Sequence, residues 1–250
     1  MNKILVVAFL FFMGSLLGWG LEVMYRRFFS DANPERKWIN PGFLIGPYLP
    51  LYGFSLSAVY ILSFIPVTFI HNKWGQKIVL FVLMAMVITL IEYIAGLIFI
   101  KGMKIKLWDY TEEWGNIKGI ICPKFSFYWI VLSAVYYFLI HPNVQKSIEW
   151  LAGHLAFSFF IGFFYGVFLI DICYSMNIMK RMRDFAVENQ LEIKYESLKA
   201  HIAKINEERK LKPSFMFAFK TDNRMTLKEI LSKYVESEQT RIKGKLSKRG

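Results

Sequence analysis

Three acidic residues lie within or at the ends of long apolar runs, and they are the first candidates for chemistry in this sequence. They are Glu22, Glu92 and Asp171. A carboxylate at the centre of a membrane helix costs about 3 kcal/mol on insertion scales, so it generally faces the interior of a helix bundle or binds a partner. Glu92 lies deepest in its run, and we interpret it as a functional or network-forming residue.

Simpler interpretations stay open for the other two carboxylates. Glu22 precedes Arg26 by four residues, a spacing at which opposite charges pair along one face of a helix. Asp171 lies near the end of its run, where its side chain could reach water. Each residue is therefore either part of a polar site or an ordinary structural group.

A segment rich in proline and glycine precedes the second apolar run. Proline removes a backbone donor and restricts the residue before it, whereas glycine tolerates positive φ. Irregular backbone at membrane depth survives only where protein or water covers it. We expect either a re-entrant or hinge-like segment with free backbone groups facing a cavity, or a loop at the headgroup level with proline in the first helical turn. The polar candidates are Asn40 and Tyr52, and the structural positions are Gly42, Gly46, Pro47, Pro50 and Gly53.

A second loop combines aromatic, acidic and amide side chains. Trp108, Asp109 and Tyr110 are consecutive, and Asn116 and Gly119 follow them. Amphipathic rings prefer the membrane interface, so Trp108 and Tyr110 are also explained by an aromatic belt. Asp109 and Asn116 are candidates for the same polar site, although Asp109 could instead cap a helix or pair with an arginine of a loop.

These residues require a helical scaffold in a bilayer. The sequence is 55% hydrophobic with 24 phenylalanines, which is too apolar for an ordinary soluble domain. About 20 apolar residues let a helix cross the hydrocarbon core. The runs predict an all-α polytopic membrane protein with about five transmembrane helices, within a domain covering residues 1–176; the spans are residues 4–25, 48–70, 78–100, 125–140 and 151–176.

The basic residues predict the orientation of these spans. Residues 177–250 hold 18 Lys or Arg against 10 Asp or Glu, and positive loops remain cytoplasmic. The basic loops 26–47 and 101–124 belong to the same side. We therefore expect a multi-pass protein of the cell membrane with its N-terminus outside and its C-terminus cytoplasmic. Glu22, Glu92 and Asp171 then share the cytoplasmic half of the bilayer.

Residues 177–250 form a basic cytoplasmic tail that we expect to be helical. Apolar residues recur at steps of four and three from Leu191 to Ile205, the spacing of a short coiled-coil seam. A second amphipathic stretch covers about residues 226–246. An apolar patch at residues 215–219 beside lysines could lie on an anionic leaflet or dock on a partner protein. Nucleic acid is not an expected partner.

Several classes of activity find no support in the sequence. Residues spaced as a phosphate-binding loop, G-x-x-x-x-G-K, are absent, and neither a metal-binding nor a nucleophilic constellation is present. We therefore expect no metal and no cofactor, and enzymatic activity stays uncertain. The pairs Gly14/Gly18 and Gly162/Gly166 favour close packing of the first and fifth spans, within the chain or in a homo-oligomer.

The order of motifs over about residues 1–140 resembles a membrane family known as "putative ABC-transporter type IV", also labelled "putative ABC transporter permease". Two arginines of the family's pattern are replaced here, at Pro41 and Ile120. The residues that carry the likeness are Gly18, Trp19, Glu22, Gly42, Phe43, Gly46, Pro47, Pro50, Tyr52, Gly53, Glu92, Trp108, Asp109, Tyr110, Asn116, Gly119, Ile121, Cys122, Ser126 and Trp129.

The resemblance implies a permease-like transporter component, in which the acidic residues and the broken loop would line a cytoplasm-facing polar site among the helices. An ATP-driven form would need a separate ATPase subunit. Two alternatives remain: a membrane scaffold or regulatory protein that recruits a soluble partner through the basic tail, and a membrane-embedded enzyme that modifies lipids. The bilayer itself is the one partner that all three hypotheses share.

Overall fold

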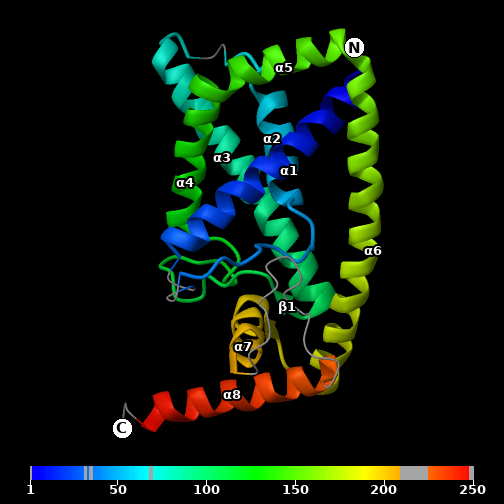
Figure 1. The fold of residues 1–250 in the computed structure, drawn as a ribbon. Coiled ribbons are helices and arrows are strands. Elements are labelled where there is room, and N and C mark those ends of the chain that lie inside the picture. Colours follow the sequence, from blue (N-terminus) through cyan, green and yellow to red (C-terminus); the bar gives the residue numbers. More distant parts are fainter. Residues whose placement is uncertain (1, 31–32, 34–35, 68–69, 209–224, 248–250) are drawn as a thin grey trace.

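Apolar helices form the upper part of the structure in Figure 1, and the polar tail lies below them. The computed structural model describes residues 2–30, 33, 36–67, 70–208 and 225–247, with only the backbone described for 241–247. The helices are α1 (Lys3–Phe28), α2 (Pro50–Leu62), α3 (Lys73–Leu97), α4 (Pro123–Val135), α5 (His141–Gly153), α6 (Ser158–Glu188), α7 (Tyr195–Glu208) and α8 (Leu227–Ser247). The expected all-α fold is confirmed.

Three short helical turns extend these helices. The π-helical turn η1 (Ile98–Met103) continues α3, η2 (Tyr136–Ile140) joins α4 to α5, and the 3₁₀ turn η3 (Leu155–Phe157) precedes α6. Four of the resulting helices are long and apolar enough to cross a membrane: Lys3–Phe28, Lys73–Met103, Pro123–Gly153 and Leu155–Glu188. The chain is therefore a multi-pass membrane protein.

The second predicted span is shorter than expected. Residues 48–70 were predicted to span, but α2 ends at Leu62. A helix of this length extends only about 20 Å, less than the hydrocarbon core of about 30 Å. Pro66 explains part of the difference, because it disfavours helical backbone at Ile65. At the other end, Pro50 occupies the first turn of α2, where its missing N–H costs nothing.

The connection between the fourth and fifth predicted spans, residues 141–150, is helical and belongs to α5. The helix from Pro123 continues through η2, and α5 then lies across the end of the bundle (Figure 1). Pro142 at the start of α5 cannot donate to the preceding turn and favours such a change of direction. The predicted span 125–140 falls within α4 and η2, which are part of the longer candidate membrane helix Pro123–Gly153.

Two glycines of α1 allow close contact with α2. A Cβ at Gly14 would lie 2.8 Å from the carbonyl oxygen of Tyr52, and one at Gly18 would lie 2.1 Å from the Tyr52 ring. The pair at Gly162 and Gly166 has nothing within 4 Å among the described atoms. The predicted close packing is present for the first span, with α2 as its partner, and the described residues show none for the α6 pair.

The tail has a hydrophobic core of its own. Helix α6 runs without a break past residue 176 to Glu188, and its far end packs against α7 and α8. The predicted seam is buried there, through Tyr195, Leu198, Ile202 and Ile205, so these residues pack within the chain. The patch at residues 215–219 lies outside the described residues.

A two-stranded parallel sheet joins the tail to the membrane part. Strand β1 (Ile105–Lys106) follows η1, and β2 (Ile193–Lys194) follows α6, with Ile105 opposite Ile193. Both isoleucines are fully buried in the core of the tail. This pairing fixes the start of α7 beneath the loops that connect the membrane helices (Figure 1).

Candidate functional site

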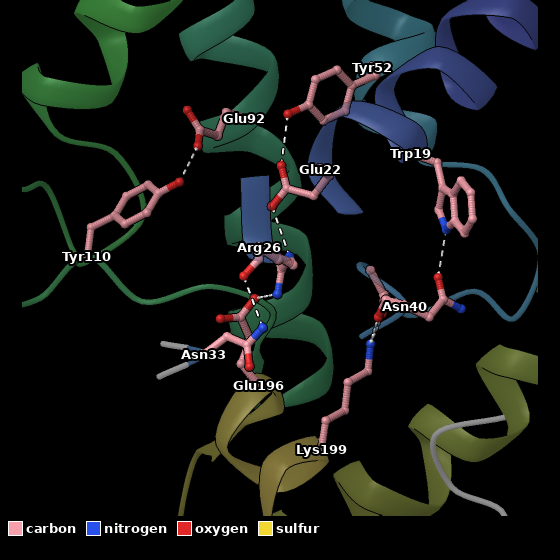
Figure 2. A network of polar contacts seen from close by, with 11 residues as sticks. Trp19, Glu22, Arg26, Asn33, Asn40, Tyr52, Glu92, Tyr110, Glu196 and Lys199 are labelled. Carbon is pink, nitrogen blue, oxygen red and sulfur yellow. Dashed lines mark hydrogen bonds and ion pairs between the residues drawn. The ribbon is translucent and has the colours of Figure 1, made fainter. Parts of the chain in front are cut away.

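Two groups of polar side chains lie near the tail end of the bundle. The carboxylate cluster consists of Glu22, Arg26, Tyr52, Glu92, Tyr110 and Trp129. The loop cluster consists of residues 40–49 with Trp19, Asp171, Ser175 and Lys199. Figure 2 shows side chains from both groups side by side, with α7 below them.

Glu92 is the most enclosed acidic residue of the carboxylate cluster. Its side chain points from α3 into the bundle and is only 3% exposed. The Tyr110 hydroxyl donates to Oε1 at 3.2 Å, and Trp129 Nε1 donates to Oε2 at 3.0 Å. Burial raises the pKa of Tyr110 well above its usual value, so this hydroxyl keeps its proton and donates. No cation in the described part of the chain forms an ion pair with Glu92.

Glu22 lies on α1 close to Glu92 and has a different set of partners (Figure 2). Tyr52 of α2 donates its hydroxyl to Oε2 at 2.9 Å, and Arg26 Nε bonds to Oε1 at 3.0 Å. The i,i+4 pair anticipated from the sequence is therefore present. Arg26 also forms an ion pair with Glu196 of α7. The Tyr52 and Trp129 rings meet edge to face at 5.9 Å, which connects the partners of the two carboxylates.

Asp171 binds the backbone of the proline-rich segment. Its carboxylate accepts the N–H of Ile45 at 3.1 Å and of Gly46 at 2.7 Å. It also accepts the hydroxyls of Tyr48 at 2.6 Å and Ser175 at 2.8 Å. Asp171 is 8% exposed. Among the described residues no hydrogen bond joins it to the carboxylate cluster, and its hydrogen bonds with Ile45, Gly46 and Tyr48 hold the proline-rich segment on α6.

Asn40 and Lys199 hold the other end of the same segment. The Asn40 amide donates to the carbonyls of Leu44 and Ile45 and accepts Trp19 Nε1 at 2.7 Å. Lys199 reaches up from α7 and donates to the carbonyl oxygens of Asn40 at 2.7 Å and Gly42 at 2.5 Å (Figure 2). Gly42 has a φ of 73°, a conformation that favours glycine.

The segment is therefore ordered by side chains from three helices. The free backbone groups that were predicted to face a cavity are instead bonded to Asp171, Asn40 and Lys199, and Leu49 N–H donates to the Ser15 carbonyl at 2.9 Å. Irregular backbone at membrane depth must be covered by protein or by water, and here protein covers it.

Asp109 and Asn116 organise the second loop and do not line the carboxylate cluster. Asp109 pairs with Lys194 at 2.6 Å and with Lys106 at 3.8 Å, and it accepts the N–H of Thr111. Asn116 bonds to backbone groups of Thr111, Glu113 and Gly119. Trp108 donates to the Ile120 carbonyl at 2.8 Å. Only Tyr110 of this loop reaches the cluster, so an aromatic belt does not explain it.

Asp109 is expected to stabilise the contact between loop and tail in a pH-dependent way. Burial raises its pKa, but Lys194, Thr111 and Lys106 lower it more, so the pKa lies below its usual value. The stabilisation is present above the ordinary pKa of about 3.9 and is lost as the pH falls through the lowered value. We expect Asp109→Asn to lower the free energy of unfolding by about 1–2 kcal/mol at pH 7. Thermal unfolding in detergent should show the difference from wild type shrinking below pH 4.

The neighbouring Glu112→Gln variant is the control for this prediction. Glu112 is exposed, and its replacement removes a similar charge without breaking the contact. An Asp109→Asn variant as stable at pH 7 as Glu112→Gln would show that the pair with Lys194 contributes nothing.

Sequence reasoning missed Lys199, Tyr48 and Glu196. Lys199 carried a signal, because it directly follows Leu198 in an apolar seam and precedes Ile202 by three residues. A lysine at such a position is buried only if its amine forms hydrogen bonds with polar groups. The contact of Arg26 with Glu196 had no local signal, because 170 residues separate the two.

Within the described residues, no group of three or more His, Cys, Asp or Glu side chains could hold a metal ion. One pocket on the described surface is lined by η1 and α6 and another by α6 and α8, and Glu22 and Glu92 line neither. What the carboxylate cluster offers is a pair of acidic groups from two spans with hydroxyl, indole and guanidinium partners.

Comparison with known proteins agrees with this architecture. A family model described as "Putative ABC-transporter type IV" matches residues 9–176, which include most of each candidate membrane helix and both polar clusters apart from Lys199 of α7. No curated protein and no solved structure matched the chain. The family and the apolar helices fit a membrane transport component. The match extends over most of the sequence, and the chain belongs to the Putative ABC-transporter type IV family.

Proposed function

We propose that this protein is the membrane subunit of a transporter, with the carboxylate cluster as its polar site. The observation that carries the proposal is the meeting of Glu22 and Glu92, from two different apolar helices, at one place in the bundle (Figure 2). Carboxylates inside membrane helices are costly and mark substrate or ion pathways by default. Family membership supports the same conclusion.

The partners of Glu92 favour a function for it beyond structure. The two hydrogen-bond donors to Glu92 are neutral side chains. The nearby Glu22 carboxylate repels the negative charge of Glu92 and is itself paired with Arg26. Asp171, which holds the proline-rich segment, accepts four hydrogen bonds, whereas Glu92 accepts two and pairs with no cation among the described residues. The Glu92 carboxylate can accept further hydrogen bonds, and its negative charge suits a proton or a positively charged group of a substrate.

The site opens toward the cytoplasm in this proposal. Helices α1, α3 and α6 run in one direction, from the end with α5 toward the tail (Figure 1). The basic tail and the basic loops at the same end favour a cytoplasmic location. Movement of α7, whose Glu196 binds Arg26, would then uncover the cluster from the cytoplasmic side.

Energy for transport would come from a separate ATPase subunit, since the sequence has no phosphate-binding loop of its own. Cross-linking in native membranes, followed by capture of the tagged chain in mild detergent, tests this step. We expect a chain with a G-x-x-x-x-G-K loop to be captured. Its absence from cross-linked membranes would contradict the ATP-driven form of the proposal.

Glu92→Gln tests the site itself. Glutamine keeps the size of the side chain, accepts from Trp129 through its carbonyl and donates to Tyr110 through its amide. We therefore expect normal membrane insertion and thermal stability. Substrate-stimulated ATP hydrolysis by the captured complex in proteoliposomes should fall to background, because the negative charge is gone.

The matched control is Glu149→Gln, which removes an exposed carboxylate on α5. This variant should behave like wild type. Full activity of Glu92→Gln would remove Glu92 from the transport site.

One observation favours a second candidate function, a membrane scaffold. Helix α8 lies across the lower end of the molecule (Figure 1), and its described outer positions, such as Lys233 and Glu236, are exposed. A phenotype that survives Glu92→Gln but requires α8 would support recruitment of a soluble protein through the tail.

A further inference from the structure

A pocket lies on the surface of α6 where the membrane part meets the tail, and no residue of either polar cluster lines it. Its volume is about 440 Å³, and its lining comes from η1 and from one face of α6: Met103, Cys173, Met176, Asn177, Lys180 and Arg183. Relative to Cys173, the other α6 residues lie three, four, seven and ten positions further along, which is one face of a helix, so the pocket extends along the helix rather than around it.

The chemistry of the pocket changes along this face. Met103, Cys173 and Met176 form an apolar part, Asn177 follows, and two cations complete the lining at the tail end. Lys180 and Arg183 are exposed. In the described part of the chain neither forms an ion pair, and Asp184 lines a different pocket between α6 and α8. Both cations are therefore available to an anion.

The change in chemistry coincides with the edge of the bilayer. About 20 helical residues cross the hydrocarbon core, and counted from Leu155 this number places the boundary close to Met176. Each further residue rises about 1.5 Å, so Lys180 and Arg183 lie roughly 6 and 10 Å beyond Met176 along the axis. Met103 lies three residues beyond Ile100, where the predicted span of residues 78–100 ends, just as Met176 ends the predicted span of residues 151–176, so a second apolar run places the boundary at a similar level.

We propose that this pocket binds the headgroup of an anionic phospholipid from the leaflet on the side of the tail. Lys180 and Arg183 would pair with the phosphate, Asn177 would face the glycerol region, and Met103, Cys173 and Met176 would contact the first part of the acyl chains. Basic pockets between membrane helices are suited to such headgroups. The inference does not depend on transport or on Glu92.

The test measures lipid retention by the purified full-length protein. The protein is solubilised with an equimolar mixture of phosphatidylglycerol and phosphatidylcholine, and bound lipid is counted by native mass spectrometry. We expect wild type to retain phosphatidylglycerol selectively. The double variant Lys180→Gln/Arg183→Gln should lose about thirtyfold in affinity for phosphatidylglycerol, the factor expected from two cations at the membrane surface.

Two further variants separate the pocket from general charge and from folding. Lys204→Gln/Lys233→Gln removes the same charge from exposed positions of α7 and α8 and should retain the lipid. Lys180→Arg/Arg183→Lys keeps both charges and should also retain it.

Three results would overturn the proposal. One is equal retention of the two lipids by wild type, and another is unchanged phosphatidylglycerol retention in the glutamine double variant. The third is displacement of the lipid by millimolar inorganic phosphate, which would mean that the pocket recognises the anion alone.

Discussion

Replacing Lys199 with methionine is expected to release α7 from the membrane part. The lysine side chain is 6% exposed, and its amine is a donor to the carbonyls of Asn40 and Gly42. Methionine fills similar space without a donor, and each buried carbonyl left without its bond costs about 1–3 kcal/mol. We expect docking to weaken by about 3 kcal/mol, which corresponds to roughly hundredfold faster amide exchange. Hydrogen exchange of α7 and of residues 40–46 measures the change.

Lys204→Met is the matched control, because Lys204 is an exposed lysine of the same helix. It should leave the exchange of residues 40–46 unchanged. Equal exchange in the two variants would mean that Lys199 does not hold the segment.

The same contact should strengthen as the pH rises. Burial lowers the pKa of Lys199 well below its usual value, and a neutral amine still has one hydrogen for each carbonyl. Between the lowered pKa and the ordinary value of about 10.4, undocked α7 binds a proton that docked α7 does not. Stability therefore increases with pH in this window. Exchange corrected for its intrinsic pH dependence should show the slope in wild type and not in Lys199→Met.

Asp171→Ala is expected to have the largest effect on stability. The carboxylate accepts four hydrogen bonds, two of them from backbone N–H groups of the proline-rich segment. Alanine leaves these donors unsatisfied within protein, and we expect a loss of about 4 kcal/mol. The midpoint of thermal unfolding in detergent should fall by roughly 10 °C.

Asp184→Ala provides the comparison, since Asp184 is an exposed carboxylate of the same helix. Asp171→Asn should be intermediate, because the amide oxygen still accepts from part of the segment. If Asp171→Ala unfolded at the same temperature as Asp184→Ala, the anchoring of residues 45–48 on α6 would be refuted.

The acidic residues of the apolar runs show what sequence reasoning can and cannot reach. A carboxylate in an apolar run is conspicuous because its transfer cost is large and local to the residue, and Glu92 and Asp171 are both buried. The sequence could not separate their roles. Asp171 binds the backbone of a segment that is 125 residues away from it in the chain, whereas Glu92 faces side chains of a loop and of α4.

Predictions that depended on helix ends were less successful. The apolar pattern of residues 48–70 continues past the point where α2 ends, and that of 125–140 stops before the helix does. Hydropathy measures how readily a side chain is transferred from water into lipid, and it says nothing about where a helix ends. The end of a helix instead depends on caps, prolines and the packing of its neighbours.

The sequence by itself determined that the chain is helical, that it crosses a membrane several times, and that its costly polar residues are few and identifiable. These properties follow from composition and from local spacing, which act within one helix. The tertiary structure alone decided that α7 reaches the membrane part through Lys199 and Glu196 and that two carboxylates meet near Tyr52. Such contacts join residues far apart in the chain, and their free energy depends on the whole fold rather than on any local pattern.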